Sequence, residues 1–129
     1  MSAAREAVLA ARYVALTTFR RDGTPVVTPV WAGVEAGTLY LFSNPTAGKV
    51  KRIRNNGRVT LAPCTATGSI IGAAIDGSAR LMDPAEMPTV WRLLVNRYGI
   101  QARLFVAYDR LRRLLRRPGA AGIEVRLSV

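Results

Sequence analysis

The stretch that decides the fold covers residues 13–44 and reads YVALTTFRRDGTPVVTPVWAGVEAGTLYLFSN. Asp22-Gly23 lies at its first turn, and this dipeptide readily adopts the positive φ angles that a tight β-hairpin needs. Towards its end, aliphatic side chains at positions 39 and 41 alternate with aromatic ones at 40 and 42, a period of two that is typical of a strand. The stretch therefore predicts three consecutive antiparallel strands, over residues 13–20, 25–33 and 38–43.

The rest of the chain adds three strands and four short helices. Asp83 and Glu86 flank Pro84 in the pattern of a capping box, which predicts the start of one of the helices. The helices are expected over residues 2–12, 46–55, 90–98 and 102–117, and the strands over 58–64, 69–82 and 123–129. No repeat or linker interrupts these elements. The sequence thus predicts one domain over residues 1–129, mainly β with α decoration, folded as a six-stranded antiparallel barrel.

The composition excludes several kinds of chemistry. The chain has 129 residues, no histidine and one cysteine, Cys64. Histidine general bases, Ser-His and Cys-His nucleophiles, Cys/His zinc sites and internal disulfides are therefore excluded, and we assign no catalytic side chain and no metal ligand. The longest uncharged stretch, residues 59–75, is shorter than the ~20 residues of a membrane helix, so no stable membrane insertion is expected. No signal-peptide pattern opens the sequence, which favours a cytoplasmic location.

The charge of the chain points to an anionic partner. Nineteen basic residues against eight acidic ones give a formal net charge of +11. Such a balance favours nucleic acid, an anionic membrane, or a phosphorylated or polycarboxylate small molecule. Seventeen of the basic residues are arginine, and the two lysines, Lys49 and Lys51, lie two positions apart.

Both lysines fall in residues 43–56, SNPTAGKVKRIRNN, where Thr46 is the expected N-cap of a helix. Cations in the first turns of a helix oppose its macrodipole, at ~0.3–1 kcal/mol each. A bound phosphate would offset this cost, because it accepts the free amides and pairs with Lys49, Lys51 and Arg52. The alternative is a solvated basic helix whose charges face water. A chain without histidine also suits reactions in which a cofactor carries the electrons, and a redox cofactor with a phosphate tail satisfies both observations.

These residues resemble the split β-barrel flavin and deazaflavin oxidoreductase superfamily, the relatives of pyridoxamine 5′-phosphate oxidase that share the FMN-binding split barrel. The likeness is carried by the ordered set DGxPxxxPVW (22–31), KxKRxxNN (49–56) and RVTLAPC (58–64), and it covers nearly the whole chain. It is closest to the small actinobacterial-type branch described as dependent on coenzyme F420.

The resemblance implies a homodimer with the cofactor in a groove between the subunits. By position, Thr28, Pro29, Val30 and Trp31 would line the cofactor ring, largely through their backbone, and Ser43, Lys49, Lys51 and Arg52 would hold the phosphate. The implied activity is hydride transfer between reduced F420 and a small conjugated or heteroaromatic substrate. F420 also carries an oligoglutamate tail, which suits the basic chain, and FMN is the alternative cofactor. An arginine signature of many relatives is missing from residues 65–77, which leaves the substrate open and keeps a pure cofactor carrier as an alternative.

The runner-up interpretation is a binding module. The arginine-rich helix at residues 103–117 would grip nucleic acid or an anionic membrane surface, with Leu104, Tyr108, Leu111 and Leu115 as its packing face. The sequence contains no helix-turn-helix, zinc finger or RNA-binding signature, so no nucleic-acid partner is expected. Cys64 is expected to be a buried structural thiol.

Overall fold

The computed structural model describes residues 3–128. Two expected element ends, Ser2 of the first helix and Val129 of the last strand, lie outside these residues. The elements follow one another as α1 (Ala3–Ala10), β1 (Tyr13–Phe19), β2 (Pro25–Val30), β3 (Gly33–Glu35), β4 (Thr38–Ser43), α2 (Gly48–Asn55), β5 (Arg58–Cys64), β6 (Ile75–Leu81), the 3-10 turn η1 (Pro84–Glu86), α3 (Met87–Tyr98), α4 (Ile100–Leu114) and β7 (Ala121–Leu127).

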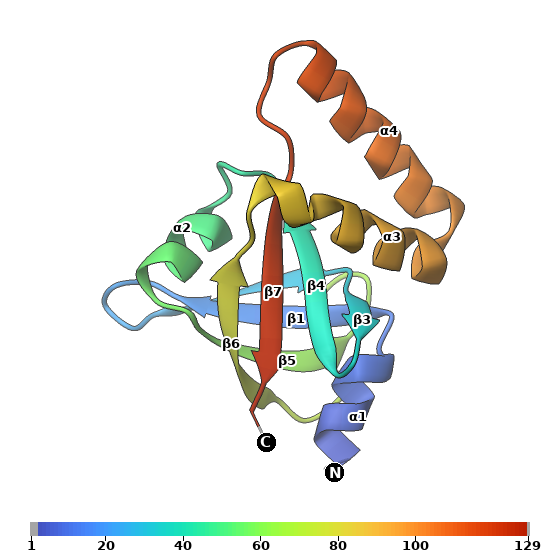
Figure 1. Ribbon diagram of the computed structural model, residues 1–129. Coiled ribbons are helices and arrows are strands. Elements are labelled where there is room, and N and C mark those ends of the chain that lie inside the picture. Colours follow the sequence, from blue (N-terminus) through green and yellow to red (C-terminus); the bar gives the residue numbers. More distant parts are fainter. Residues whose placement is uncertain (1–2, 129) are drawn as a thin grey trace.

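The strands form one antiparallel sheet in the order β2-β1-β5-β6-β7-β4-β3. Its two outermost strands, β2 and β3, are consecutive in the chain and are joined by Trp31 and Ala32 alone. Because so short a link holds both ends of the sheet together, the sheet has to curl (Figure 1). The predicted fold, a mainly β split barrel with helical decoration, is confirmed.

The predicted number and pairing of strands are partly wrong. Within residues 3–128 the sheet has seven strands instead of six, because the run expected over 25–33 divides at Trp31. β4 consequently pairs with β3 and β7, and not with β2 as three consecutive paired strands would require. The Asp22-Gly23 hairpin is confirmed: β1 pairs with β2 around it, and Gly23 has a φ of 90°. The strand expected over 69–82 begins only at Ile75, after a turn and an irregular stretch.

Tyr98 satisfies the backbone of the link between β2 and β3. The N–H of Ala32 donates to the Tyr98 hydroxyl at 3.1 Å, and this hydroxyl donates to the carbonyl of Arg12 at 2.7 Å. The Tyr98 ring stacks on Trp31 with 4.6 Å between the ring centroids. Ala32 is fully buried, so its N–H needs a partner inside the protein. The last residue of α3 thereby fixes the point at which the two ends of the sheet meet.

Arg97 completes the same junction. Its guanidinium donates to the Ala32 carbonyl at 2.7 Å, and to the carbonyls of Leu9 at 3.0 Å and Ala11 at 2.8 Å. The latter two lie in the last turn of α1 and just after it, where carbonyls have no partner within the helix. One side chain of α3 thus joins α1 to the link between β2 and β3.

Two apolar clusters lie on opposite sides of β4. Leu39 and Leu41 point into the barrel, and Tyr40 and Phe42 point outward beneath the helices, as the alternation predicted. The barrel core contains, among others, Val14, Leu16, Val59, Leu61, Ile123 and Val125, and the outer cluster contains Met87, Val90, Leu94, Tyr98 and Ala102. Cys64 is buried, as expected. None of the helices in residues 3–128 has the length and apolar character required to cross a bilayer.

The packing face predicted for the arginine-rich helix is wrong. Leu104, Tyr108, Leu111 and Leu115 are all exposed, and the buried positions of α4 are Ala102 and Asp109. The Asp109 carboxylate accepts the N–H of Ala120 at 2.7 Å and bonds Arg113 at 3.1 Å, so a polar contact turns this side of α4 inward. Amphipathicity identified the two faces of the helix, but it did not decide which of them meets the protein.

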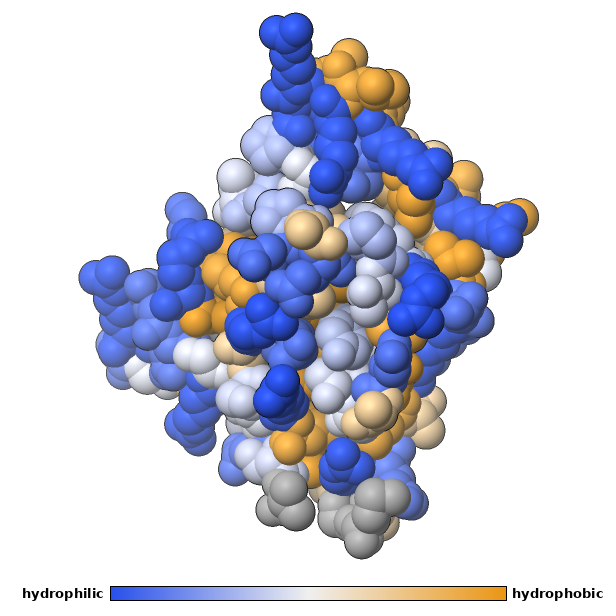
Figure 2. All heavy atoms as spheres, in the orientation of Figure 1, coloured by the Kyte–Doolittle hydropathy of each residue, from blue (hydrophilic) through white to orange (hydrophobic). Residues whose placement is uncertain are grey.

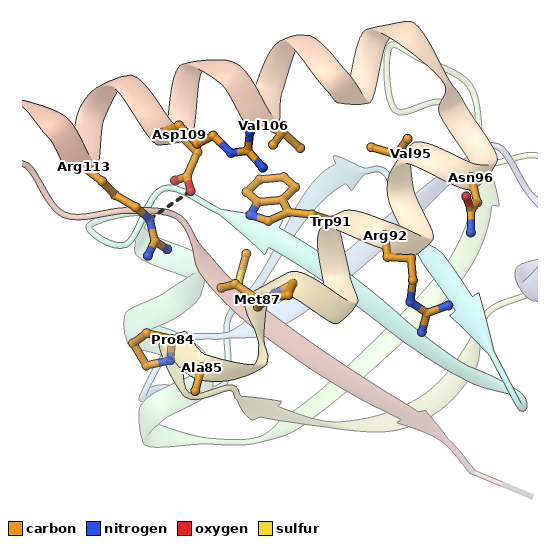
Figure 3. A pocket seen from close by; sticks show the side chains of 12 residues that line it. Pro84, Ala85, Met87, Trp91, Arg92, Val95, Asn96, Val106, Asp109 and Arg113 are labelled. Carbon is orange, nitrogen blue, oxygen red and sulfur yellow. Dashed lines mark hydrogen bonds and ion pairs between the residues drawn. The ribbon is translucent and has the colours of Figure 1, made fainter.

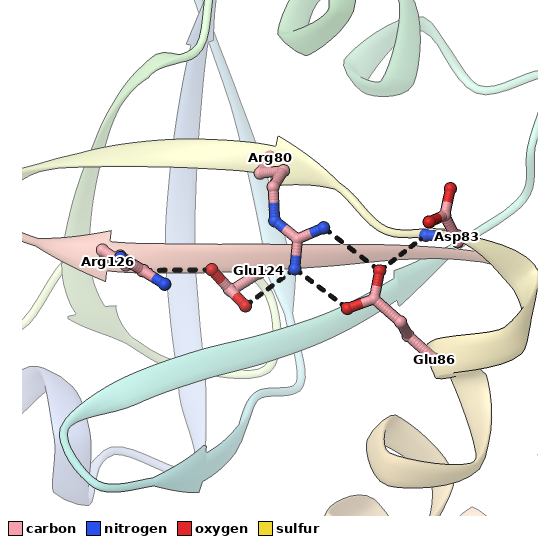
Figure 4. A network of polar contacts seen from close by, with 5 residues as sticks. All are labelled: Arg80, Asp83, Glu86, Glu124 and Arg126. Carbon is pink, nitrogen blue, oxygen red and sulfur yellow. Dashed lines mark hydrogen bonds and ion pairs between the residues drawn. The ribbon is translucent and has the colours of Figure 1, made fainter.

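A network of ion pairs joins β6, η1 and β7 (Figure 4). Arg80 bonds both carboxylate oxygens of Glu86, at 3.1 and 2.9 Å, and one oxygen of Glu124 at 3.0 Å. Glu86 also accepts the N–H of Asp83 at 2.9 Å, and η1 starts with Pro84, so the predicted capping box is confirmed. The hydrogen bonds from Arg80, followed by the one from the Asp83 backbone, lower the pKa of Glu86 from 4.5 to about 2.

Replacing Glu86 by Gln is expected to make the free energy of unfolding depend less on pH in the acidic range. A carboxyl group whose pKa is lower in the folded than in the unfolded state stabilises the folded state. The contribution is complete above the unfolded pKa of 4.5 and disappears as the pH falls to about 2. Urea unfolding between pH 7 and pH 2.5 is therefore expected to find E86Q less stable at pH 7, with the gap closing in acid. Glu6→Gln, at an exposed carboxylate of α1, is the control. A gap that stays constant with pH would contradict this role of Glu86.

Tyr98→Phe is expected to lower the free energy of unfolding by about 1–3 kcal/mol, because it leaves the buried N–H of Ala32 without an acceptor. Urea denaturation measures the change. Tyr108→Phe is the matched control, since this tyrosine is 59% exposed. Equal stabilities for the two variants would show that the hydroxyl of Tyr98 does not hold the junction.

Candidate functional site

A basic groove lies between α2 and the β1–β2 hairpin. Lys51 and Arg52 reach it from α2, and Arg20 and Arg21 reach it from the hairpin. Phe19, Asn55 and Asn56 complete the lining, and the groove has a volume of about 610 Å³. Of the residues that the structure describes, no carboxylate forms an ion pair with any of these four cations. A cation-rich hollow whose cations form no ion pairs has the chemistry of an anion site.

Arg52 is the best anchored of these cations. Its Nε donates to the hydroxyl of Thr18 at 2.6 Å, and Thr18 is fully buried in β1. Gly48 leaves room for the guanidinium, since a Cβ at this position would lie 2.7 Å from one of its terminal nitrogens. The guanidinium is thus fixed against the barrel while its remaining N–H groups are available to a ligand.

The two lysines lie in different surroundings, and the predicted N-cap of α2 is wrong. Lys51 is exposed and lines the groove, whereas Lys49 is half-buried and does not. Burial, followed by the neighbouring charge of Arg52, lowers the pKa of Lys49. Thr46 is not the N-cap: that residue is Ala47, and no side chain caps α2. The side-chain oxygen of Asn44 instead accepts both the N–H of Thr46, at 3.0 Å, and its hydroxyl, at 2.9 Å.

Strand β2 connects the basic groove with the predicted ring-binding residues. Thr18, which holds Arg52, lies opposite Val26 in the register of β1 and β2. Trp31 follows five residues later, roughly 17 Å along an extended strand at about 3.4 Å per residue. Among the described residues β2 pairs with β1 alone, so half of its backbone groups face away from the sheet. This edge is suited to the backbone contacts that Thr28, Pro29, Val30 and Trp31 are expected to make.

The side chains of these four residues point in different directions. Pro29 is exposed and Thr28 is half-buried, while Val30 belongs to the barrel core. Trp31 packs between the face of Tyr98 and Phe105, and the ring centroids of Trp31 and Phe105 lie 5.3 Å apart in an edge contact. Its outer side forms a shallow shelf with Gln101, Leu104, Phe105 and Tyr108. The indole is therefore partly a packing residue and partly available to a ligand.

Ser43 is not among the residues that line the basic groove. It lines a hollow of about 250 Å³ whose walls include Phe42, Trp91, Phe105 and Tyr108, with Arg112 at one side. The hydroxyl of Ser43 donates to the carbonyl of Asn44 at 3.1 Å. This aromatic hollow shares Phe105 and Tyr108 with the shelf at Trp31. Ser43 thus lies in the same region as the predicted ring site and apart from the predicted phosphate site.

A further groove of about 540 Å³ runs between α3 and α4, with the indole of Trp91 inside it and the Asp109–Arg113 pair at one end (Figure 3). None of the residues predicted to bind a cofactor lines it. Its walls are largely apolar and its cations lie at the rim, so it does not offer the concentrated positive charge of the groove beside α2.

Comparison with known proteins identifies the family. The sequence profile of pyridoxamine 5′-phosphate oxidase matches residues 1–124. The chain belongs to the pyridoxamine 5′-phosphate oxidase family. No protein of curated function matches the chain.

Solved structures share the fold of this pyridoxamine 5′-phosphate oxidase family member. A protein of unknown function from Agrobacterium tumefaciens is similar with a TM-score of 0.69 and 19% identity over 97% of this chain, which spans 54% of that protein. A conserved hypothetical protein from Mycobacterium tuberculosis has a TM-score of 0.67 and 22% identity, covering 98% of this chain and 84% of its own. An F420 reductase has a TM-score of 0.62 and 17% identity, covering 100% and 96% respectively.

Sequence reasoning missed two groups of residues in this family member. Arg20 and Arg21 lie beside the predicted turn, and their charge was a signal that the hairpin contributes to the anion site; they line the groove with the middle and the end of α2. The aromatic wall formed by Phe42, Trp91 and Phe105 comes from three separate elements, and no local pattern links them. Lys51 and Arg52 are brought together as predicted, while Lys49 does not line the basic groove and Ser43 lines the aromatic hollow.

The charge of Arg52 is expected to hold down the pKa of Lys49, so Arg52→Gln is expected to raise it. An NMR titration of the lysine Cε and Hε signals measures the shift, and Lys51→Arg assigns the two lysine resonances. Arg54→Gln removes an equal charge from the same helix and is the control. A midpoint for Lys49 that does not move in R52Q would contradict the coupling.

Proposed function

We propose that this member of the pyridoxamine 5′-phosphate oxidase family is an oxidoreductase that binds coenzyme F420 and transfers a hydride between the reduced deazaflavin and a small conjugated or heteroaromatic substrate. The observation that carries the proposal is the groove of four cations that form no ion pairs within the described residues, which β2 connects to an aromatic shelf. One end of this path suits an anionic tail, and the other suits a flat ring.

The basic groove is suited to the phosphate part of the cofactor. Lys51 and Arg52 would pair with its oxygens, and the bond from Arg52 to Thr18 orients the guanidinium before the ligand arrives. Arg20 and Arg21 extend the positive charge beyond the first anion. A polyanionic tail such as the oligoglutamate of F420 would use this extension, because charged groups spaced along a chain each need a counterion.

The edge of β2 is suited to orienting the ring. Its outward backbone groups lie at fixed spacing, and all of them can accept or donate hydrogen bonds except at Pro25 and Pro29, which offer only a carbonyl, so they would hold a planar heterocycle without side-chain chemistry. The cofactor supplies the hydride chemistry when bound. The chain's own contribution is to position the two reactants and to exclude water, which agrees with a sequence that contains no histidine.

The aromatic hollow is suited to the substrate. Phe105 and Tyr108 belong to both the hollow and the shelf, so a molecule in the hollow would lie beside a ring on the shelf. Walls of Phe42, Trp91 and Phe105 favour a flat conjugated acceptor, since aromatic pairs gain from stacked or edge-to-face contacts.

The proposal includes a homodimer with the cofactor groove at the subunit interface. Pro29 and Val27 are exposed on the outer face of β2, next to the proposed ring site. Apolar side chains in this position favour cover by a second subunit, which would also close the open side of the ligand path.

FMN is a second candidate cofactor. Four cations at one end of β2 are sufficient to neutralise a single phosphate, and the roughly 17 Å between Val26 and Trp31 also accommodates a shorter nucleotide. The tail distinguishes the two cofactors: charges beyond the first phosphate matter for F420 and not for FMN.

Lys51→Ala is expected to weaken cofactor binding by about 1.5–3 kcal/mol, the contribution of a hydrogen bond to a charged group, with an unchanged melting temperature. Fluorescence titrations with F420 and with FMN, side by side, measure both affinities. The double variant Lys49→Ala and Lys51→Ala is expected to bind at least as weakly.

Arg54→Ala is the matched control, because Arg54 is an exposed cation of α2 that does not line the groove. It is expected to bind like the unaltered protein. Equal losses in K51A and R54A would show that net charge and not the groove attracts the cofactor. No binding of either cofactor by the unaltered protein would refute the proposed function.

A further inference from the structure

The outer face of α4 is an exposed apolar stripe. Five aliphatic side chains of this segment are between 52% and 80% exposed: Ile100, Leu104, Leu111, Leu114 and Leu115. Together they form the largest group of exposed aliphatic side chains among the described residues. Isolated exposed leucines are ordinary, but a contiguous group of this kind marks a surface that meets another apolar phase.

Helical geometry places this stripe directly away from the protein. Ile100, Leu104, Leu111 and Leu114 are separated by steps of three, four and seven residues, so they lie along one side of the helix. The buried residues Ala102 and Asp109 lie on the opposite side. Because α4 is also an outermost element of the fold, the stripe forms a ridge that a flat surface could meet along its length (Figure 1).

Arginines accompany the stripe and give the ridge a strong positive charge. They are Arg103, Arg110, Arg112, Arg113, Arg116 and Arg117, all within the segment 100–117. Asp109 is the acidic residue of this segment, and it is buried against Ala120 and Arg113. Hydrophobic and hydrophilic side chains lie next to each other along this edge of the molecule (Figure 2). The ridge therefore complements a surface that is negatively charged outside and apolar beneath.

A second copy of the chain does not complement this ridge. Two-fold pairing of α4 would bring two sets of six arginines together with no exposed carboxylate of the segment between them. Nucleic acid would pair with the arginines but would leave the five aliphatic side chains in water. A bilayer of anionic lipid satisfies both halves, because phosphates meet the guanidinium groups and acyl chains accept the leucines.

We propose that α4 is a docking surface for anionic phospholipid bilayers, on which the helix lies parallel to the membrane plane with Leu111 and Leu114 buried among the acyl chains. The arginines extend from the sides of the helix to the lipid phosphates. The protein stays peripheral, since the stripe is one face of a helix and not a span. The inference does not depend on the proposed cofactor, because Leu111 and Leu114 line neither the basic groove nor the aromatic hollow.

Co-flotation of the full chain with vesicles tests the proposal. Vesicles of phosphatidylcholine with 30 mol% phosphatidylglycerol, chosen as about a third anionic lipid, are compared with phosphatidylcholine alone. Binding is expected to be at least about tenfold stronger on the anionic vesicles at 0.1 M salt, and to fall steeply as the salt rises towards 1 M. Equal binding to both compositions, or no binding to either, would overturn the proposal.

Two pairs of variants locate the contact. Leu111→Ser with Leu114→Ser is expected to weaken vesicle binding at least about tenfold, whereas Ile70→Ser with Ile71→Ser, at side chains that are 57% and 68% exposed on another surface, is expected to have no effect. Arg103, Arg110 and Arg117 changed to Gln are expected to reduce binding, and Arg20, Arg21 and Arg54 changed to Gln are the charge-matched control. If the controls weaken binding as much as the α4 variants do, attraction of the net charge explains the result and the proposal fails.

Two further results would reassign the ridge. Light scattering of the Leu111 and Leu114 variant without vesicles is expected to give the oligomeric state of the unaltered protein, and a dimer that dissociates would identify the ridge as an interface between copies. Binding of duplex DNA that weakens with the three α4 arginine changes but not with the leucine changes, together with absent vesicle binding, would assign the ridge to nucleic acid.

Discussion

The link of two residues between β2 and β3 is the constraint on which the rest of the structure depends. A chain that leaves one edge of a sheet and joins the other has to pass through a point where neither ladder supplies backbone partners. Tyr98 and Arg97 supply them for Ala32, and the same two residues reach Arg12, Leu9 and Ala11. The same hydrogen bonds therefore close the barrel and fix the position of α3. They also restrict the position of α4, because only Gly99 separates the two helices.

This arrangement connects the candidate sites. Tyr98 positions Trp31 by stacking, and Trp31 contacts Phe105 of α4, so the shelf exists only when the helices are seated. At the other end of β2, the bond between Arg52 and Thr18 ties α2 to the barrel. The strand between these two points is a rigid spacer. An elongated ligand with a charged end and a flat end would meet both features without a large rearrangement of the protein.

Local signals in the sequence predicted local structure well. The turn at Gly23, the alternation in β4 and the capping box at Glu86 depend on neighbouring residues, and each is confirmed. The division of the strand at Trp31 depends on partners more than sixty positions away, which no periodicity reveals. The direction of α4 depends on one buried contact between Asp109 and Ala120. For the site, spacing placed Lys51 and Arg52 together on α2, but the contribution of the hairpin and the separation of Ser43 required the fold.

The scarcity of lysine has a practical consequence. Both lysines lie on α2, and one of them lines the groove, while arginine supplies the positive charge elsewhere. Reagents that acylate primary amines would therefore modify this helix and the amino terminus and leave most of the surface untouched. Protein immobilised through amine coupling at Lys51 would be tethered at the basic groove, so a biosensor prepared in this way would understate affinity for any anion that binds in this groove.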